Sequence, residues 1–234
     1  MKKTSVNCKA LLDEFNVKYF HEKLFSWWKD HKRVYPWRFE KDPYKVLIAE
    51  TFLHRTNSSQ VEKIYKDFIK KFPEIKSLLK AKKEEILPLL QSLGWRWRQE
   101  LFNKMILILR EKYGGNIPLN YKELKSLPGI GDYIAAAVII FTLNTPLPLL
   151  DSNIVRVTGR LFCLKITDSS RRSRLFRDYI YCFLYKNDPR VFYYVLIDFA
   201  ALVCKPKNPD CNKCPFENIC CFYNRHREGS HGIN

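Results

Sequence analysis

Apolar residues along this chain recur every three to four positions, which is the spacing of amphipathic and buried helices. No segment alternates apolar and polar residues for long enough to predict a β-strand. The pattern predicts helices over Asp13–Lys29, Tyr44–Leu53, Gln60–Phe72, Lys83–Leu93, Arg98–Lys112, Tyr121–Ser126, Asp132–Leu143 and Ser152–Phe162, with two more within 175–203. We therefore expect an all-α fold.

Composition narrows the class of protein without deciding its function. The 234 residues are 46% hydrophobic, enough for a core, and carry a net charge of +17 from 41 Lys and Arg against 24 Asp and Glu. A domain this basic commonly binds a polyanion, but charge alone does not separate nucleic acid from an acidic membrane or from a solvated basic surface. The longest apolar run, Ile134–Leu143, is about half of the ~20 residues that span a bilayer, so no membrane span is predicted.

The first ten residues, MKKTSVNCKA, are charged and polar and lack the apolar centre of a secretory signal peptide. We expect an intracellular protein of the cytoplasm, associated with the nucleoid if the source is prokaryotic. In that compartment cysteines stay reduced.

Four cysteines with the spacing C-x6-C-x2-C-x5-C lie within 17 residues: Cys204, Cys211, Cys214 and Cys220. Zinc ribbons place two tight pairs well apart, whereas only one pair is tight here, which favours one [4Fe–4S] cluster. The alternative, two disulfides of a secreted domain, lacks a signal peptide. Cys163 and Cys182 lie in apolar stretches and are expected to be core thiols, while Cys221 directly follows a ligand.

The segment Leu127-Pro128-Gly129-Ile130-Gly131 predicts a tight turn between two helices, because Pro128 ends the first and the glycines permit the reversal. The second helix then presents free N–H groups at its N-terminus, an anion site that suits a duplex phosphate without reading its bases. Lys125 adds positive charge beside this helix-hairpin-helix turn.

Four segments together are similar to the helix-hairpin-helix, Gly/Pro, Asp (HhH-GPD) superfamily of base-excision DNA glycosylases. They are P-Y-K-V-L-I-A-E-T-F-L-H-R-T (43–56), L-P-G-I-G (127–131), L-L-D-S-N-I-V-R-V (149–157) and the four-cysteine loop. The resemblance covers about 35–224 and implies a two-lobed all-α fold. It implies a six-helix lobe over 38–148 that ends in the hairpin, and a second lobe from 1–37 plus 149–224 with the [4Fe–4S] loop at 204–220. The tail, 225–234, is expected to be disordered.

Single positions separate three branches of this superfamily. Endonuclease III-like enzymes carry a lyase lysine where this chain has Tyr133, and a phenol forms no Schiff base. Adenine glycosylases usually carry Ser there, and they carry a glutamate matched by Glu50 and a large C-terminal domain that the chain is expected to lack. Mismatch-specific thymine/uracil glycosylases carry the Tyr and the glutamate, with L-R-R-T where this chain has L-H-R-T (53–56), so His54 departs from the pattern. The resemblance favours this third branch.

The resemblance gives Asp151, Tyr133 and Glu50 catalytic roles. A carboxylate at Asp151 stabilises positive charge on the deoxyribose and activates water, although a helix N-cap is the ordinary role of such an Asp. Tyr133 contacts the flipped base or Asp151, or only packs on its helix. Glu50 hydrogen-bonds the base edge, or faces solvent. Asn153 orients Asp151, binds the DNA backbone, or caps the helix.

Removal of a base from the stack leaves a gap and an unpaired guanine. Arg55 and Trp95 are the candidates to fill the gap and bind that guanine, with His54 beside them. Arg96 and Arg98 are expected at phosphates, together with Lys125, Gly129 and Gly131. The expected partner is double-stranded DNA with a mismatched or damaged base, and the protein is expected to be a monomer.

Three functions follow from these residues. The preferred one is a monofunctional glycosylase that excises thymine or uracil mispaired with guanine. The first alternative excises adenine from A:G or A:8-oxoguanine pairs. The second is a non-catalytic iron–sulfur DNA-binding module, which has no need of Asp151.

Overall fold

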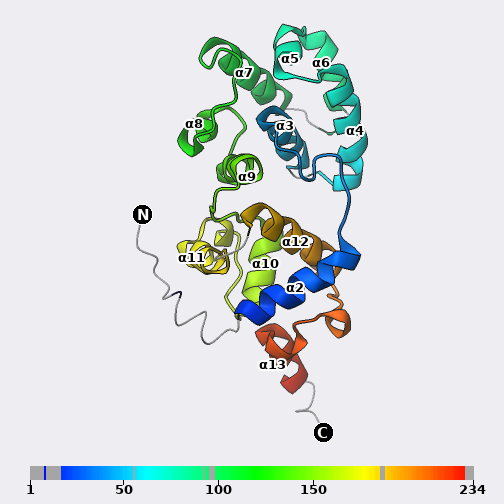
Figure 1. Cartoon of the computed structure of the whole chain (residues 1–234), viewed down its shortest axis with the longest axis vertical. Helices are drawn as coiled ribbons and strands as arrows, with labels where there is room; N and C mark the ends of the chain where they lie inside the picture. Colours follow the sequence, from blue (N-terminus) through cyan, green and yellow to red (C-terminus); the bar gives the residue numbers. More distant parts are fainter. Residues whose placement is uncertain are drawn as a thin grey trace. The chain divides into compact units, whose positions relative to one another are not determined.

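The computed structural model describes residues 8, 17–54, 56–91, 93–94, 98–184 and 188–229, with side chains as far as 225. Every regular element in these ranges is a helix, which confirms the predicted all-α fold (Figure 1). The α-helices are α2 (Val17–His31), α3 (Pro43–Leu53), α4 (Ser58–Lys71), α5 (Ile75–Lys80), α6 (Lys83–Gln91), α7 (Arg98–Glu111), α8 (Tyr121–Ser126), α9 (Asp132–Leu143), α10 (Ser152–Leu161), α11 (Arg174–Phe183), α12 (Pro189–Leu202) and α13 (Cys221–Gly229). Three short 3₁₀ helices are η1 (Ser170–Arg172), η2 (Cys211–Lys213) and η3 (Glu217–Ile219).

The chain divides into two units: unit 1 is Met1–Arg33 with Pro146–Asn234, and unit 2 is Val34–Thr145. Unit 2 is therefore one continuous segment inserted into unit 1. No helix in the described ranges is both long and apolar enough to cross a membrane.

Unit 2 is built around α3 and α9, which pack against each other. Eight consecutive residues of α9, 134–141, are buried, so this helix is enclosed on all sides. Helix α4 packs on α3, and α8 packs on α9. The ring of Phe68 contacts those of Phe52 and Phe102 edge to face, with centroids 5.1 and 6.2 Å apart. This core fixes α3 and α9, the two helices that carry Glu50 and Tyr133.

Short polar residues cap the N-termini of three helices of unit 2. Asp42 accepts a hydrogen bond from the Tyr44 N–H at the start of α3, and Pro43 occupies the first turn. Asn57 and Asn120 cap α4 and α8 in the same way. The sequence signals for these helix starts are therefore local and are satisfied by their own neighbours.

Helix α12 is the centre of unit 1, since both α2 and α10 pack on it. Its Asp198 is fully buried and accepts hydrogen bonds from Trp28 Nε1 at 2.9 Å, Arg33 Nε at 2.7 Å and the Arg33 N–H at 3.1 Å. A buried carboxylate is tolerated when it is paired and hydrogen-bonded in this way. The contacts tie α2 and the last residue before unit 2 to α12.

The expected disorder of 225–234 is wrong for its first five residues, because α13 continues to Gly229; residues 230–234 lie outside the described ranges. Two contacts anchor the start of α13: a disulfide joins Cys221 to Cys163, and the Arg160 guanidinium lies 4.9 Å from the Phe222 ring centroid. Helix α5 was also not predicted.

The expectation of reduced core thiols at Cys163 and Cys182 is also wrong. Both form disulfides, Cys163 with Cys221 and Cys182 with Cys8. The partners lie 58 and 174 residues apart in the sequence, so no local pattern indicates the pairing. Cys221 therefore has a bonded partner of its own beside Cys220, one of the four expected cluster ligands.

Candidate active site

Asp151 stands at the start of α10 with both carboxylate oxygens hydrogen-bonded. Oδ1 accepts from the Ile154 N–H at 2.7 Å, which confirms the N-cap, and Oδ2 accepts from Asn153 Nδ2 at 2.8 Å. Burial raises the pKa of the Asp151 carboxyl above its ordinary value, against the opposing effect of these hydrogen bonds. The carboxylate is thus fixed in one orientation, and of the roles expected for Asn153 the structure shows contact with Asp151.

A chain of hydrogen bonds continues from Asp151 to the cysteine loop. Asn153 Oδ1 accepts from Arg156 Nη2 at 3.0 Å, and Arg156 Nε donates to the backbone oxygen of Cys204 at 2.8 Å. Arg156 Nη2 also donates to the Ala200 carbonyl at 2.9 Å. Because a guanidinium only donates, it holds the Asn153 oxygen toward itself and turns the Asn153 NH₂ toward Asp151.

The eight cysteines separate into two sets. Four are in disulfides, and the other four have free thiols and line one pocket of unit 1: Cys204, Cys211, Cys214 and Cys220. Apolar side chains, among them Phe199 and Phe216, form the rest of the wall. No three His, Cys, Asp or Glu side chains in the described part of the chain converge closely enough for a single metal ion. The donor set is therefore four soft thiols around a shared apolar space.

Arg160 brings positive charge to this pocket. Its Nη1 lies 3.4 Å from Cys204 Sγ and donates to the Lys205 carbonyl at 2.6 Å, while its Nη2 donates to the Pro206 carbonyl at 3.0 Å. Its backbone oxygen accepts from the Cys220 thiol at 3.6 Å. Arg160 thus connects α10 to both ends of the cysteine loop.

Unit 2 holds the other two catalytic candidates. Glu50 on α3 is only 5% exposed, so the alternative in which it faces solvent is wrong. Tyr133, the second residue of α9, is half-buried. The two side chains stand on α3 and α9, the helices that pack against each other in unit 2. A buried carboxylate there is consistent with a site that binds a polar ligand.

The hairpin between α8 and α9 has the geometry expected of a tight turn. Gly129 has φ +81°, a backbone conformation that residues with a side chain rarely adopt, so the turn favours glycine. Gly131 is the N-cap of α9, and no side chain caps that helix. The first N–H groups of α9 therefore have no capping side chain, as an anion site needs. Lys125 Nζ lies 2.6 Å from Asp132 Oδ1.

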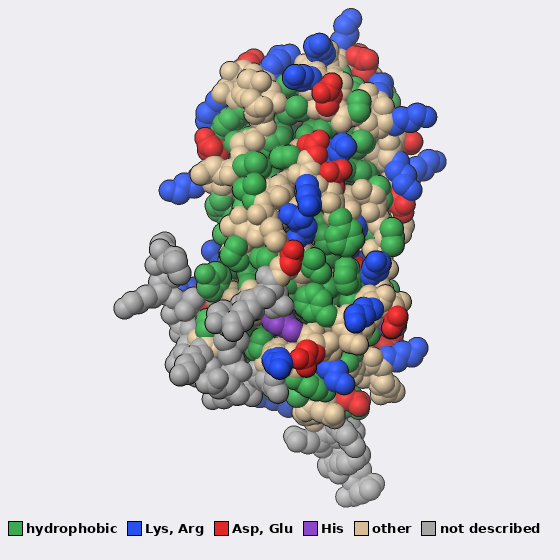
Figure 2. Space-filling model, in the orientation of Figure 1, with side chains coloured by type: hydrophobic (Ala, Val, Ile, Leu, Met, Phe, Trp, Pro, Cys, Tyr) green, Lys and Arg blue, Asp and Glu red, His purple; other side chains and the backbone are tan. Residues whose placement is uncertain are grey.

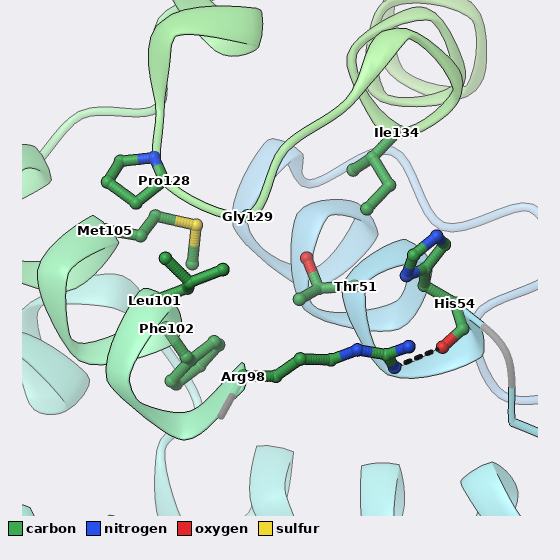
Figure 3. Close-up of a pocket in the computed structure, with 9 residues that line it drawn as sticks. All are labelled: Thr51, His54, Arg98, Leu101, Phe102, Met105, Pro128, Gly129 and Ile134. Carbon is green, nitrogen blue, oxygen red and sulfur yellow. Dashed lines mark hydrogen bonds between the residues drawn. The ribbon is translucent and has the colours of Figure 1, made fainter. Parts of the chain in front are cut away.

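A small pocket of unit 2 brings His54 and the hairpin together. The pocket lies between α3, α7, the hairpin and the start of α9 (Figure 3). Its lining residues are Thr51 of α3, His54 at the C-cap of α3, Arg98, Leu101, Phe102 and Met105 of α7, Pro128 and Gly129 of the hairpin, and Ile134 of α9. Arg98 Nη1 donates to the His54 carbonyl at 2.7 Å. Arg98 thus fixes the chain at His54 in addition to the phosphate contact expected of it. Arg55, Trp95 and Arg96 lie outside the described residues.

Comparisons with known proteins give the family. No family model matches the chain. The thymine/uracil-DNA glycosylase of Pyrobaculum aerophilum is 36% identical over 215 residues, which are 88% of this chain and 92% of that protein. The adenine DNA glycosylase of Buchnera aphidicola subsp. Baizongia pistaciae is 34% identical over 207 residues, 87% of this chain and 58% of that protein. A solved thermostable thymine-DNA glycosylase matches with a TM-score of 0.81 and 30% identity, over 92% of this chain and 99% of that one.

This chain is a helix-hairpin-helix base-excision DNA glycosylase. The resemblance read from the motifs is confirmed, and with it the HhH-GPD fold. The similarity to DNA glycosylases therefore argues against the alternative of a non-catalytic DNA-binding module.

The surface of the glycosylase is strongly basic, in keeping with a polyanionic substrate. Figure 2 shows Lys and Arg side chains over the visible face, interspersed with fewer Asp and Glu. The net charge of +17 favours rapid, salt-dependent association with nucleic acid.

Motif reading did not single out Arg156 and Arg160 of the glycosylase. Their signal in the sequence is weak: two arginines four residues apart on α10, where a solvated pair on one helix face is the ordinary interpretation. Their distant partners are backbone carbonyls 44 to 48 residues further along the chain, which a sequence pattern does not indicate.

We expect Arg156→Lys to slow base release by about 10- to 100-fold in single-turnover assays. A lysine cannot donate to Asn153, Ala200 and Cys204 at once, so the Asn153 amide is no longer held in the orientation that serves Asp151. The acid limb of the pH–rate profile should also shift to higher pH, because burial raises the pKa of Asp151 and the hydrogen bond from Asn153 that opposes this rise is weakened.

Arg160→Lys is the matched control for Arg156→Lys. It lies one turn further along α10 and has no contact with Asn153, so it should lower thermal stability without shifting the acid limb. Equal losses of rate in the two variants would refute the positioning role of Arg156.

Proposed function

We propose that this glycosylase hydrolyses the N-glycosidic bond of thymine or uracil mispaired with guanine, and that it does not cut the DNA strand. The observation that carries the proposal is Tyr133 at the hairpin, in a chain 36% identical to a thymine/uracil-DNA glycosylase over 92% of that relative. The second residue after Gly131 is where the related branches differ, and a phenol offers no amine for a Schiff base.

The chemistry assigned to Asp151 requires an ionised carboxylate in a fixed place. Departure of the base leaves positive charge on the deoxyribose, which a negative group beside C1′ stabilises. The bond to the base breaks with its electron pair staying on the base nitrogen, which then takes up a proton from solvent; the carboxylate accepts a proton from the attacking water as the water oxygen bonds to C1′. The hydrogen bonds from Ile154 and Asn153 support this role, because they orient the carboxylate in advance of the reaction.

The flipped base is assigned to Glu50 and Tyr133. Glu50 is buried and offers acceptors to the ring N–H of thymine or uracil, and Tyr133 offers a ring face and a hydroxyl. We assign the unpaired guanine and the gap in the stack to His54, Arg55 and Trp95, the last two from the sequence alone.

Phosphates are assigned to a second group of residues, which lie around the hairpin and in the segment after α6. They are Gly129, Gly131, Lys125 and Arg96. Asn153 has a supporting role at Asp151. Double-stranded DNA with a mismatched base is then the partner, and we propose that the protein acts as an intracellular monomer in the cytoplasm or at the nucleoid.

A [4Fe–4S] cluster fits the four free thiols. They are soft donors, they line a single pocket with apolar walls, and Arg160 places a positive charge against Cys204, as suits an anionic iron–sulfur group. Cys204, Cys211, Cys214 and Cys220 would hold it. When bound, a cluster cross-links the loop that follows α12, and the residues of α10 do the chemistry.

The test is a panel of duplexes that contain T:G, U:G, A:G or A:8-oxoguanine, with alkali added after incubation to cut at abasic sites. We expect cleavage of T:G and U:G duplexes alone. Cleavage confined to the adenine duplexes would replace the proposal with adenine excision. Base release from none of the four would refute both assignments of the base.

The absence of strand cleavage is tested separately, with borohydride in the reaction and with alkali left out. We expect no covalent complex between protein and DNA and no strand breaks before alkali, because Tyr133 has no amine. A trapped complex would show that a lysine or the N-terminus acts as the nucleophile and that the enzyme is a lyase.

A further inference from the structure

The hairpin carries an acidic residue where a phosphate is expected to bind. Asp132 is the first residue of α9, and its Oδ1 lies 2.6 Å from Lys125 Nζ of α8. The same oxygen accepts from the Tyr121 hydroxyl at 2.5 Å. One carboxylate oxygen therefore binds both a cation and a hydroxyl from α8, the helix that packs on α9.

This arrangement alters the role of Lys125. Its ammonium group is the charge expected to contact the DNA backbone, yet here a carboxylate of the same chain neutralises it. Both side chains are about half exposed, 50% for Lys125 and 46% for Asp132. An ion pair at this exposure is weak and readily exchanges one anion for another. A DNA phosphate and the Asp132 carboxylate thus compete for the same ammonium group.

The Tyr121 hydroxyl is a second hydrogen-bond donor to the Asp132 carboxylate. When Lys125 turns to a phosphate, the Tyr121 hydroxyl still donates to Asp132 and keeps a hydrogen bond on the negative oxygen. The carboxylate then remains beside the bound phosphate and repels it. Repulsion of this kind acts equally on every duplex, because phosphates carry no sequence information.

We propose that Asp132 competes with DNA phosphate for Lys125. This competition weakens binding of the hairpin to all duplexes and speeds release of the abasic product. The inference rests on the proposed contact between the hairpin and DNA, and adds to it a group that opposes binding. Its consequence is an enzyme that leaves undamaged DNA and product sooner than its charge of +17 alone would allow.

The test compares Asp132→Asn with Glu123→Gln in the full-length protein. Both variants remove one negative charge near the hairpin, and Glu123 is an exposed residue of α8 that no salt bridge joins to Lys125 in the described structure. Binding to an undamaged duplex and to a T:G duplex is measured by fluorescence anisotropy over a range of salt. Steady-state excision of T:G is measured in parallel.

We expect Asp132→Asn to bind both duplexes about fivefold more tightly at about 0.1 M salt, and the slope of log K against log salt to steepen by about one. Steady-state turnover should fall, since product leaves later. Glu123→Gln should change affinity less than twofold and leave the slope unaltered. The effect of Asp132→Asn on the slope should disappear in Lys125→Ala, in which no ammonium group is released.

Four outcomes decide the proposal. Unchanged affinity and slope in Asp132→Asn, in a protein with unchanged thermal unfolding, would overturn it, as would an equal gain in Glu123→Gln. If the wild-type protein excises no base from any duplex but Asp132→Asn still tightens binding, the proposed function fails and the competitor role stands. If excision occurs and Asp132→Asn changes nothing, the competitor role alone fails.

Discussion

Asp151→Asn should lower the rate of base release by about a thousandfold or more in single-turnover assays on T:G and U:G duplexes. A neutral amide cannot stabilise the positive charge that develops on the sugar. The fold should survive, because Asn is also a good N-cap and still accepts from the Ile154 N–H. Only the hydrogen bond from Asn153 Nδ2 is lost, because that NH₂ then faces the NH₂ of the new amide; the loss should cost about 1 kcal/mol.

Asp188→Asn is the matched control for this substitution. Asp188 is the N-cap of α12 in the same unit and accepts from the Val191 N–H at 3.1 Å, so the chemical change and the local role are the same. Base release should remain within about twofold of wild type. Near-normal excision by Asp151→Asn, or equal losses in both variants, would remove Asp151 from the catalytic step.

The pH profile of the wild-type enzyme tests Asp151 without a substitution. The reaction needs the ionised carboxylate, so the rate should fall as pH drops through its native pKa. Because burial raises that pKa above its ordinary value, the acid limb should lie above pH 3.8. The native state then binds this proton more tightly than the unfolded chain does. This group's contribution to stability is therefore lost as pH rises through the native pKa.

Cys214→Ala should abolish iron binding and unfold the cysteine loop, whereas the Cys163→Ala/Cys221→Ala double variant should keep its iron. Cys214 is one of the four free thiols around the pocket, while the other two cysteines form a disulfide beside it. Iron binding and folding of the loop are coupled, so loss of one ligand should leave the protein insoluble or lower its thermal midpoint by more than about 10 °C.

The double variant isolates the disulfide that fastens α13. Its loss should cost about 2–4 kcal/mol in oxidising buffer and almost nothing when wild type is compared in reductant. Iron content, absorbance near ~400 nm and thermal unfolding with and without reductant distinguish the cases. Full iron in Cys214→Ala, or loss of iron in the double variant, would refute this division of the cysteines. One zinc per chain in colourless protein would replace the cluster.

Sequence reasoning succeeded where the physical cause is local. Helix α9 was predicted with its observed bounds because a long apolar run between Gly131 and Asn144 is typical of a buried helix. Asp151 was recognised as a helix start because a cap is a contact between residues three apart. The burial of Glu50, which the sequence analysis left open, accords with its apolar neighbours at helical spacing in α3.

Contacts between distant residues escaped prediction. Arg156 reaches carbonyls of residues 44 and 48 positions away, and the two disulfides span 58 and 174 residues. Such partners are set by how helices pack, which the period of one helix does not encode. Lys125 is intermediate: its charge was expected at the hairpin, but its pairing with Asp132 seven residues later depends on the angle between α8 and α9.

Because unit 2 lies between the two segments of unit 1 in the sequence, the ribosome makes the N-terminal part of unit 1 well before the rest of it. Helix α2 is buried against α12, yet about 160 residues separate them in the chain. At ~5–20 residues per second a ribosome needs ~10–30 s to pass from one to the other. During that interval Phe20 and Leu24, both buried in the finished protein, have no partner to cover them. Unit 2, a continuous segment that ends at Thr145, is synthesised completely before Pro189 is reached, so it can fold while α2 still lacks α12.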